Sequence, residues 1–328
     1  MTNMLDSCMA TIDKAKDELK KFKGWERRYA DYACQILVNL DFIEKTSIMV
    51  DKNLDKCFTL HLTSSEARDS WDKVVFDAKY LGQNVARLIC DGEVIKVSTN
   101  KRLEKNNAKH FGCEIALKDH TWDSEETKRF REHFMQSTGH PINNPELRLQ
   151  GFLVEKLTKG GLYIQPVKLG KRGKAHFMMP SAIGASAGNI KDGKRKSAHI
   201  DLLTRAGIGF HSKLCVLELK QKYGKIEKTL NQGVAYATFL IELLTVKEYD
   251  CGANWSEIFG YPKGLAKPGV SLNVAIAMPN NTKGESDKSF AGEPISIGDN
   301  KITLHYLYFN EKENDVGDIC TSLTKRCR

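Results

Sequence analysis

Residues 213–220 read Lys213-Leu214-Cys215-Val216-Leu217-Glu218-Leu219-Lys220, an apolar run that ends in a glutamate and a lysine two positions apart. Upstream, residues 198–203 read Ala198-His199-Ile200-Asp201-Leu202-Leu203 and place an aspartate among apolar neighbours. Short apolar runs of this kind predict two buried strands. Because side chains alternate along a strand, Glu218 and Lys220 share one face.

The charged residues of these two predicted strands need partners, because burying an isolated carboxylate is costly. Asp201 and Glu218 on neighbouring strands would repel each other unless a cation lay between them. A divalent ion resolves that conflict, and Mg²⁺ is the expected one because it prefers oxygen ligands and keeps several waters. The ammonium of Lys220 could then position a metal-proximal water and stabilise negative charge that grows on a phosphate.

The surrounding sequence predicts the element order α-β-β-β-α-β-β. Asn144 and Pro145 supply the cap and the first turn of the opening helix. The predicted ranges are a helix at 144–158, extended segments at 162–167, 198–204 and 213–220, a long helix at 225–244, and strands at 270–278 and 302–309.

This pattern resembles the PD-(D/E)XK nuclease superfamily, whose core is an α-β-β-β-α-β unit with an aspartate on one central strand and Glu-x-Lys on the next. The resemblance covers residues 142–310. It implies that Asp201 and Glu218 bind the metal, with the Leu219 carbonyl as a further ligand. It also implies that Lys220 is the catalytic lysine. The proline of the family's name is absent before Asp201, as it is in many members.

Two further matches extend the resemblance. Many members carry a glutamate on the first core helix, which here implies Glu146 as a catalytic and metal-binding residue; at about 100° per residue it shares a face with three leucines, whereas Glu155 lies nearly opposite. The RecB-like branch carries Gln-x-x-x-Tyr on the helix after Glu-x-Lys. Gln232 and Tyr236 fit that spacing, which implies a glutamine near the active site and a tyrosine near bound nucleic acid.

Other interpretations of these residues stay open at this point. The (D/E)-x-K triplet recurs several times in the chain, and its strongest rival is Asp77-Ala78-Lys79. We expect a helix from residue 64 to 81 there, because Ser64-Ser65-Glu66 offers capping chemistry and apolar residues recur at helical spacing, so Asp77 would be solvated. Asp201 could instead pair with Arg205, and Glu218 with Lys220 on the surface. His199, His211 and Cys215 suggest zinc only weakly, because they lack close ligand spacing.

A basic, glycine- and serine-rich segment lies between the second and third predicted core segments. The chain carries 50 Lys and Arg against 41 Asp and Glu, a net charge of +9 that favours polyanionic partners. This segment is either a solvated loop or an arm that orders on nucleic acid. Its basic residues are Lys168, Lys171, Arg172, Lys174, Lys191, Lys194, Arg195 and Lys196, with Asp192 as the one acidic residue. We expect Lys171, Arg172, Lys174, Lys194, Arg195 and Lys196 to contact nucleic acid.

The first 140 residues predict a smaller α+β domain that selects substrate or regulates. Helices are expected at 4–22, 25–40 and 123–134, extended segments at 57–63 and 113–117, and a hairpin of 85–90 with 93–99 through Asp91-Gly92. Gly139, Pro141 and the asparagines that follow indicate a boundary, which gives domains of 1–140 and 141–328.

The whole-chain expectation is an α/β, Mg²⁺-dependent endodeoxyribonuclease, with Mn²⁺ as a substitute ion. Its 328 residues contain no run apolar and long enough to span a membrane, and nine cysteines without a Cys-x-x-Cys pair indicate a reducing cytoplasm. Host defence, by restriction or abortive infection, is the context expected by analogy. Open alternatives are an RNA-cleaving or repair nuclease and a non-catalytic nucleic-acid-binding module; a homodimer is as open as a monomer.

Overall fold

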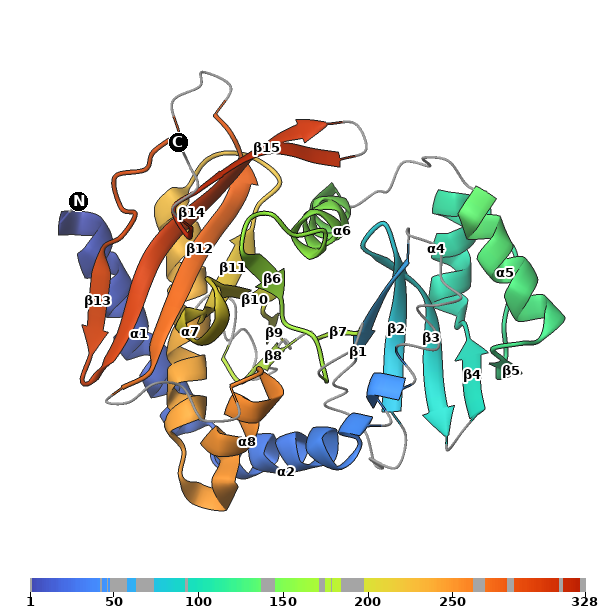
Figure 1. Ribbon diagram of the computed structural model, residues 1–328, viewed down its shortest axis with the longest axis horizontal. Helices are drawn as coiled ribbons and strands as arrows, with labels where there is room; N and C mark the ends of the chain where they lie inside the picture. Colours follow the sequence, from blue (N-terminus) through green and yellow to red (C-terminus); the bar gives the residue numbers. More distant parts are fainter. Residues whose placement is uncertain are drawn as a thin grey trace. The chain divides into compact units, whose positions relative to one another are not determined.

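The computed structural model shows an α/β protein with mixed sheets (Figure 1). It describes residues 2–41, 43–45, 47, 58–62, 74–91, 94–136, 145–170, 175–177, 179–183, 198–261, 269–281, 286–312 and 315–324. The chain divides into two compact units. The first, which we call the carboxylate unit, contains residues 1–37, 155–167 and 178–328; the second, the histidine unit, contains residues 38–154 and 168–177.

The carboxylate unit is built on one mixed sheet. Its strands run in the order β13-β14-β12-β11-β10-β6, with β15 on β14. β10 is antiparallel to both β6 and β11, whereas β11, β12 and β14 are mutually parallel. These strands are β6 (Ile164–Pro166), β10 (Leu202–Ala206), β11 (Lys213–Leu219), β12 (Ser271–Pro279), β13 (Pro294–Ile297), β14 (Asn300–Lys312) and β15 (Asp315–Thr321). The short pair β8 (Pro180–Ser181) and β9 (Ala198–His199) forms a separate ribbon.

Helix α7 (Ile226–Thr245) covers the centre of this sheet, against β11, β12 and β14, and α1 (Thr2–Lys21) packs on α7. The twelve buried residues of α7 include Gly233, Tyr236 and Phe239. A helix apolar on most of its circumference is typical of one enclosed on several sides. The sequence therefore places α7 between the sheet and α1.

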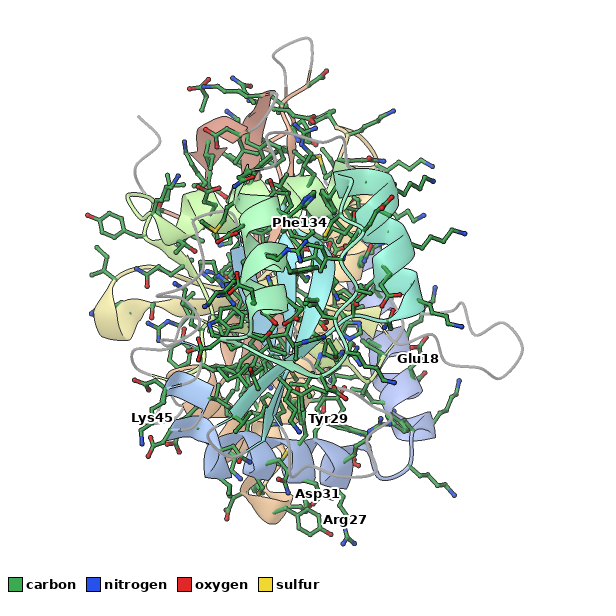
Figure 2. All side chains as sticks on the ribbon, turned by 90° about the vertical axis from the view of Figure 1, so that its right-hand side faces the viewer. Glu18, Arg27, Tyr29, Asp31, Lys45 and Phe134 are labelled. Atoms are coloured by element: carbon green, nitrogen blue, oxygen red, sulfur yellow. The ribbon has the colours of Figure 1, made fainter. Side chains whose placement is uncertain are left out.

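An aromatic cluster joins α7 to α2 (Trp25–Val38) and α8 (Cys251–Ile258). The Tyr29 ring lies 5.1 Å from that of Phe239, and the Trp255 indole donates a hydrogen bond to the Tyr29 carbonyl at 3.0 Å. Figure 2 shows Tyr29 on the inner side of α2, while Arg27 and Asp31 extend from its exposed side. The amphipathic pattern of α2 thus fixes its orientation.

The histidine unit contains a second sheet, in the order β5-β4-β3-β2-β1-β7. All neighbours are antiparallel except β1 and β7, which are parallel. Its helices are α4 (Lys101–Phe111) and α5 (Glu125–Gln136), and the first ten residues of α6 (Pro145–Thr158) also belong to it. The strands are β1 (Phe58–Leu62), β2 (Val74–Tyr80), β3 (Gln83–Asp91), β4 (Val94–Ser98), β5 (His120–Thr121) and β7 (His176–Phe177).

One face of the second sheet packs on α4 and α5 through aromatic rings. Tyr80 of β2 lies 5.3 Å from Phe111 and 5.1 Å from Phe134, between ring centroids. Figure 2 labels Phe134, which is fully buried. Because side chains alternate, the neighbours of Tyr80 and Ala78 on β2, namely Asp77 and Lys79, face the other side of the sheet.

The helix expected across residues 64–81 is wrong for its second half, which forms strand β2. Leu81 and Gly82 have φ of 48° and 83°, the geometry of a two-residue hairpin turn that joins β2 to β3. The β-branched and aromatic run Val74-Val75-Phe76 favours a strand, and its pairing with both neighbours outweighed the helical spacing. A strand expected at 113–117 is also wrong, because those residues form no regular element.

Other sequence expectations hold for the elements they name. The predicted hairpin of β3 and β4, the helices predicted at 4–22, 25–40, 123–134, 144–158 and 225–244 and the strands predicted at 213–220 and 270–278 are confirmed within a few residues. α1 and α2, which the sequence grouped with the N-terminal domain, make their contacts with the carboxylate unit. The predicted boundary near residue 140 falls at 137–144, outside the described residues. Among the described helices, none is long and apolar enough to cross a membrane.

Candidate active site

The ends of β10 and β11 bring Asp201 and Glu218 together. In the antiparallel register Leu202 pairs with Leu217, so a continuation by one residue sets Asp201 opposite Glu218. Directly opposed residues project on the same face of a sheet. The Leu219 amide donates a hydrogen bond to Oδ2 of Asp201 at 3.0 Å, which fixes the aspartate against the neighbouring strand.

Glu218 is fully buried, although it carries a carboxylate. Burial raises the pKa of Glu218 well above its ordinary value, and the Asp201 carboxylate raises it further. Its Oε2 atom is buried and accepts no hydrogen bond from the described residues. A buried oxygen without a donor, beside a second carboxylate, is the environment that a cation would stabilise.

Lys220 supplies the positive charge of this cluster. Its Nζ donates to Oε1 of Glu218 at 2.8 Å and to the Leu219 carbonyl at 2.9 Å. The Lys220 amide donates to the Ala277 carbonyl of β12 at 2.8 Å, which anchors the backbone just after β11 ends. Lys220 and Glu218 form an ion pair, but it is not the surface pair of the alternative interpretation. The Lys220 side chain is 31% exposed and that of Glu218 is 0% exposed.

Helix α7 approaches the same point through Gln232, Gly233 and Tyr236. A Cβ on Gly233 would lie 2.6 Å from Cγ1 of Val274 and 3.9 Å from Cβ of Glu218, so the missing side chain permits the close packing of α7 on the sheet. Burial raises the pKa of Tyr236, the Glu218 carboxylate raises it further, and a hydrogen bond with Gln232 lowers it. Tyr236 therefore lies within electrostatic range of the two carboxylates, and Gln232 is in contact with Tyr236.

Gly233 is the part of this arrangement that sequence reasoning missed. The signal was present, because a glycine in the middle of a long helix costs about 1 kcal/mol relative to alanine and usually marks a close packing contact. The glycine sits between Gln232 and Val234, inside the pattern that was already noted.

Glu146 and Glu155 lie on α6, whose two ends belong to different units. Glu146 stands in the first turn, half-buried, within the histidine unit, and its approach to Asp201 stays a prediction. Glu155 pairs with Lys159 at 2.7 Å, which agrees with a solvated position.

The alternative interpretations of the sequence concerned Asp77 with Lys79, Arg205 and the basic segment. Asp77 and Lys79 lie on β2 and are 7% and 4% exposed, so the expectation of a solvated aspartate is wrong. Asp77 accepts a hydrogen bond from Asn84 and its carboxylate lies 3.6 Å from the Arg87 Nε; in the described part of the chain it belongs to no group of three or more potential metal ligands. Arg205 donates to the Gly260 carbonyl at 3.2 Å. The residues of the predicted nucleic-acid arm, Lys171, Arg172, Lys174, Lys194, Arg195 and Lys196, lie outside the described residues.

The cluster of Asp201, Glu218 and the Leu219 carbonyl offers oxygen atoms only, the donor set that Mg²⁺ prefers. In the described part of the chain, no three histidine, cysteine or acidic residues converge as metal ligands, so the protein supplies two carboxylates at most from these residues. A zinc site at Cys215 has no support there, since Cys215 is fully buried on β11 and burial raises the pKa of its thiol to about 12.

Comparisons with known proteins add no relative to this picture. No family model, no curated protein and no solved structure matches the chain.

Proposed function

We propose that this protein is a Mg²⁺-dependent nuclease that hydrolyses phosphodiester bonds of DNA, with its active site at Asp201, Glu218 and Lys220. The observation that carries the proposal is the fully buried Glu218, which lies opposite Asp201, contacts Lys220 and has an Oε2 atom that no donor among the described residues reaches. A buried acidic pair beside a lysine lowers stability, and such groups are characteristic of functional sites.

The order of elements supports a restriction-endonuclease-like core. α6, β6, β10, β11, α7 and β12 follow one another in the α-β-β-β-α-β sequence of the superfamily that the motifs resemble. The short strands β7, β8 and β9, two 3-10 turns and helix α8 are inserted between them. The neighbours β6, β10, β11 and β12 lie side by side in that order, and the acidic residues stand at the ends of the two central ones.

The chain's own residues suit phosphodiester hydrolysis. Mg²⁺ supplies Lewis-acid polarisation of a phosphoryl oxygen and a more acidic water when bound. Asp201 and Glu218 would hold it, with the Leu219 carbonyl as a further oxygen. Lys220, 31% exposed and anchored beside the carboxylates, is placed to donate hydrogen bonds to an incoming phosphate oxygen.

Substrate choice rests on charge. The net charge of +9 and the basic segment between residues 168 and 196 favour a polyanion. Gln232 and Tyr236 would then lie near the reacting phosphate and the nucleic acid. DNA in a host-defence setting is the substrate and context that we propose, by analogy with other proteins of this motif pattern.

A cleavage assay tests the proposal. Purified protein with Mg²⁺ or Mn²⁺ is incubated with linear and circular duplex DNA, single-stranded DNA and RNA, and with excess chelator as the blank. We expect Mg²⁺-dependent cleavage of duplex DNA, including circular DNA. Cleavage of RNA alone would reassign the substrate, whereas binding without cleavage of any substrate would indicate a non-catalytic module.

Variants then test the residues. Asp201→Ala, Glu218→Ala and Lys220→Ala should each lower the cleavage rate by at least about 10²-fold, because each removes transition-state stabilisation. Glu155→Gln is the matched control and should cleave as the wild type does. Full activity in Glu218→Ala, with its fold verified by circular dichroism, would refute the site.

A further inference from the structure

A second polar cluster lies in the histidine unit, on the sheet face opposite α4 and α5. The register sets His61 of β1 beside Asp77 of β2 and, on its other side, beside His176 of β7. Thr59 is paired with Lys79, and an isolated bridge pairs Lys168 with His176. Residues paired in this way project on one face, so β7, β1 and β2 (Figure 1) together present His176, His61 and Lys79.

Both imidazoles are buried and incompletely hydrogen-bonded. His61 and His176 are each 5% exposed, and their ring centroids lie 5.3 Å apart. His61 Nε2 is 3.0 Å from the Thr59 hydroxyl. Nδ1 of each ring is buried and has no partner among the described residues. Buried polar atoms normally have a hydrogen-bond partner, so two buried nitrogens without one, on paired residues of neighbouring strands, indicate a missing ligand.

The electrostatics of the cluster favour an anion. Burial lowers the pKa of His61 well below its ordinary value, and Lys79 and His176 lower it further. Burial likewise lowers the pKa of His176 to about 3, with the charges of Lys168 and Lys79 adding to the effect. Cations at this point are therefore repelled by two lysines, which weighs against a metal bound to the histidine pair.

The carboxylate that the register sets beside His61 is Asp77. Asp77 accepts a hydrogen bond from Asn84 at 2.9 Å and lies 3.6 Å from the Arg87 guanidinium. Asp77 is therefore held by residues of β3, while the charges of Lys79 and Lys168 act on the two imidazoles.

We propose that His61, His176, Lys79 and Lys168 form a binding site for a phosphate group. Two imidazoles that can each donate and two ammonium groups match the several acceptor oxygens of a phosphate better than the two oxygens of a carboxylate. The phosphate belongs either to a free nucleotide or to a nucleic-acid backbone, and the site lies in the unit that does not hold Asp201 and Glu218. Its existence is independent of nuclease activity.

The test is a titration of the full-length protein, followed by NMR of the histidine ring protons and by isothermal titration calorimetry. The probes are inorganic phosphate, pyrophosphate, a mononucleotide and a short DNA duplex, all in chelator. We expect pyrophosphate to shift the His61 and His176 signals. A mononucleotide that shifts them where the duplex does not identifies a nucleotide site, and a duplex that shifts them identifies a backbone site.

Variants decide whether binding occurs at this cluster. Lys79→Met and His176→Asn should weaken pyrophosphate binding at least tenfold, and Lys168→Met, at a half-exposed position, serves if a buried variant does not fold. Lys159→Met is the matched control, because Lys159 is an exposed lysine of the other unit. Ring signals that no probe moves, or unchanged affinity in folded Lys79→Met or Lys168→Met, would overturn the proposal.

Discussion

Both sheets of the protein bury charged side chains, yet they gather charges of opposite sign. At the ends of β10 and β11, Asp201 and Glu218 lie together, and Lys220 contacts Glu218. On the second sheet, lysine charges act on two neutral histidines, and Asp77 is compensated by Arg87. Buried charged and polar groups are usually paired, so we propose a cation as the ligand of the first cluster and an anion as the ligand of the second.

The basic segment between residues 168 and 196 provides a test of the two clusters, because its two ends adjoin different clusters in the sequence. Lys171, Arg172 and Lys174 stand between Lys168 and His176, whereas Lys194, Arg195 and Lys196 shortly precede Asp201. Neutralising the second triplet should lower the log-log salt slope of DNA binding by up to about three, since each lost phosphate contact lowers it by about one. The slope is measured by fluorescence anisotropy of DNA binding at salt concentrations between about 50 and 200 mM. Ca²⁺ replaces Mg²⁺ in the buffer to prevent cleavage.

The matched control for that experiment neutralises Lys14, Lys21 and Lys23, three exposed residues of α1 and the turn after it. It should leave the slope within error. If neutralising the triplet at 171–174 lowers the slope and neutralising the triplet at 194–196 does not, the second triplet is not part of the nucleic-acid surface.

The response of stability to pH should differ in sign between the clusters. The pKa of Glu218 is raised in the folded protein, so the folded state holds more protons above pH 4.5 and the free energy of unfolding falls as pH rises from there. The pKa of His176 is lowered from 6.5 to about 3, so the unfolded state holds more protons below pH 6.5 and stability falls as pH drops through that window. Each slope is at most about 1.4 kcal/mol per pH unit per group.

Urea unfolding from pH 3.5 to 8, in chelator, measures both slopes. Glu218→Gln should remove part of the decline above pH 4.5 and leave the acid limb unchanged, and His176→Asn should do the reverse. Identical pH profiles for wild type and both variants would show that neither group is titrated by folding.

The smallest effect expected concerns the packing of α7. Gly233→Ala sets a Cβ 2.6 Å from Cγ1 of Val274, which should cost about 1–3 kcal/mol through overpacking and regain about 1 kcal/mol of helix propensity. The net loss is therefore about 1 kcal/mol in the free energy of unfolding. A double-mutant cycle with Val274→Ala should show favourable coupling of at least about 0.5 kcal/mol. Lys228→Ala, on the exposed side of α7, is the control, and additivity in the cycle would contradict the contact.

Much of the carboxylate unit follows from local sequence. The apolar run from Leu214 to Leu219 predicts a buried strand whatever surrounds it, because period-two and apolar patterns are local properties. The charges at Asp201, Glu218 and Lys220 conflict with that burial, and this conflict, together with the resemblance of the ordered motifs, marked the candidate site. The long helix at 226–245 was predictable for the same reason.

The tertiary structure decided what depends on pairing between distant segments. Residues 74–80 carry both a helical and a strand pattern, and only the partners on β1 and β3 resolve it. His61 and His176 are separated by more than one hundred residues, so no local pattern indicates that their rings meet. The sequence was sufficient to assign helices and strands in those segments where apolar residues recur with a clear period. Which charges face each other depended on strand register, which long-range hydrogen bonds fix.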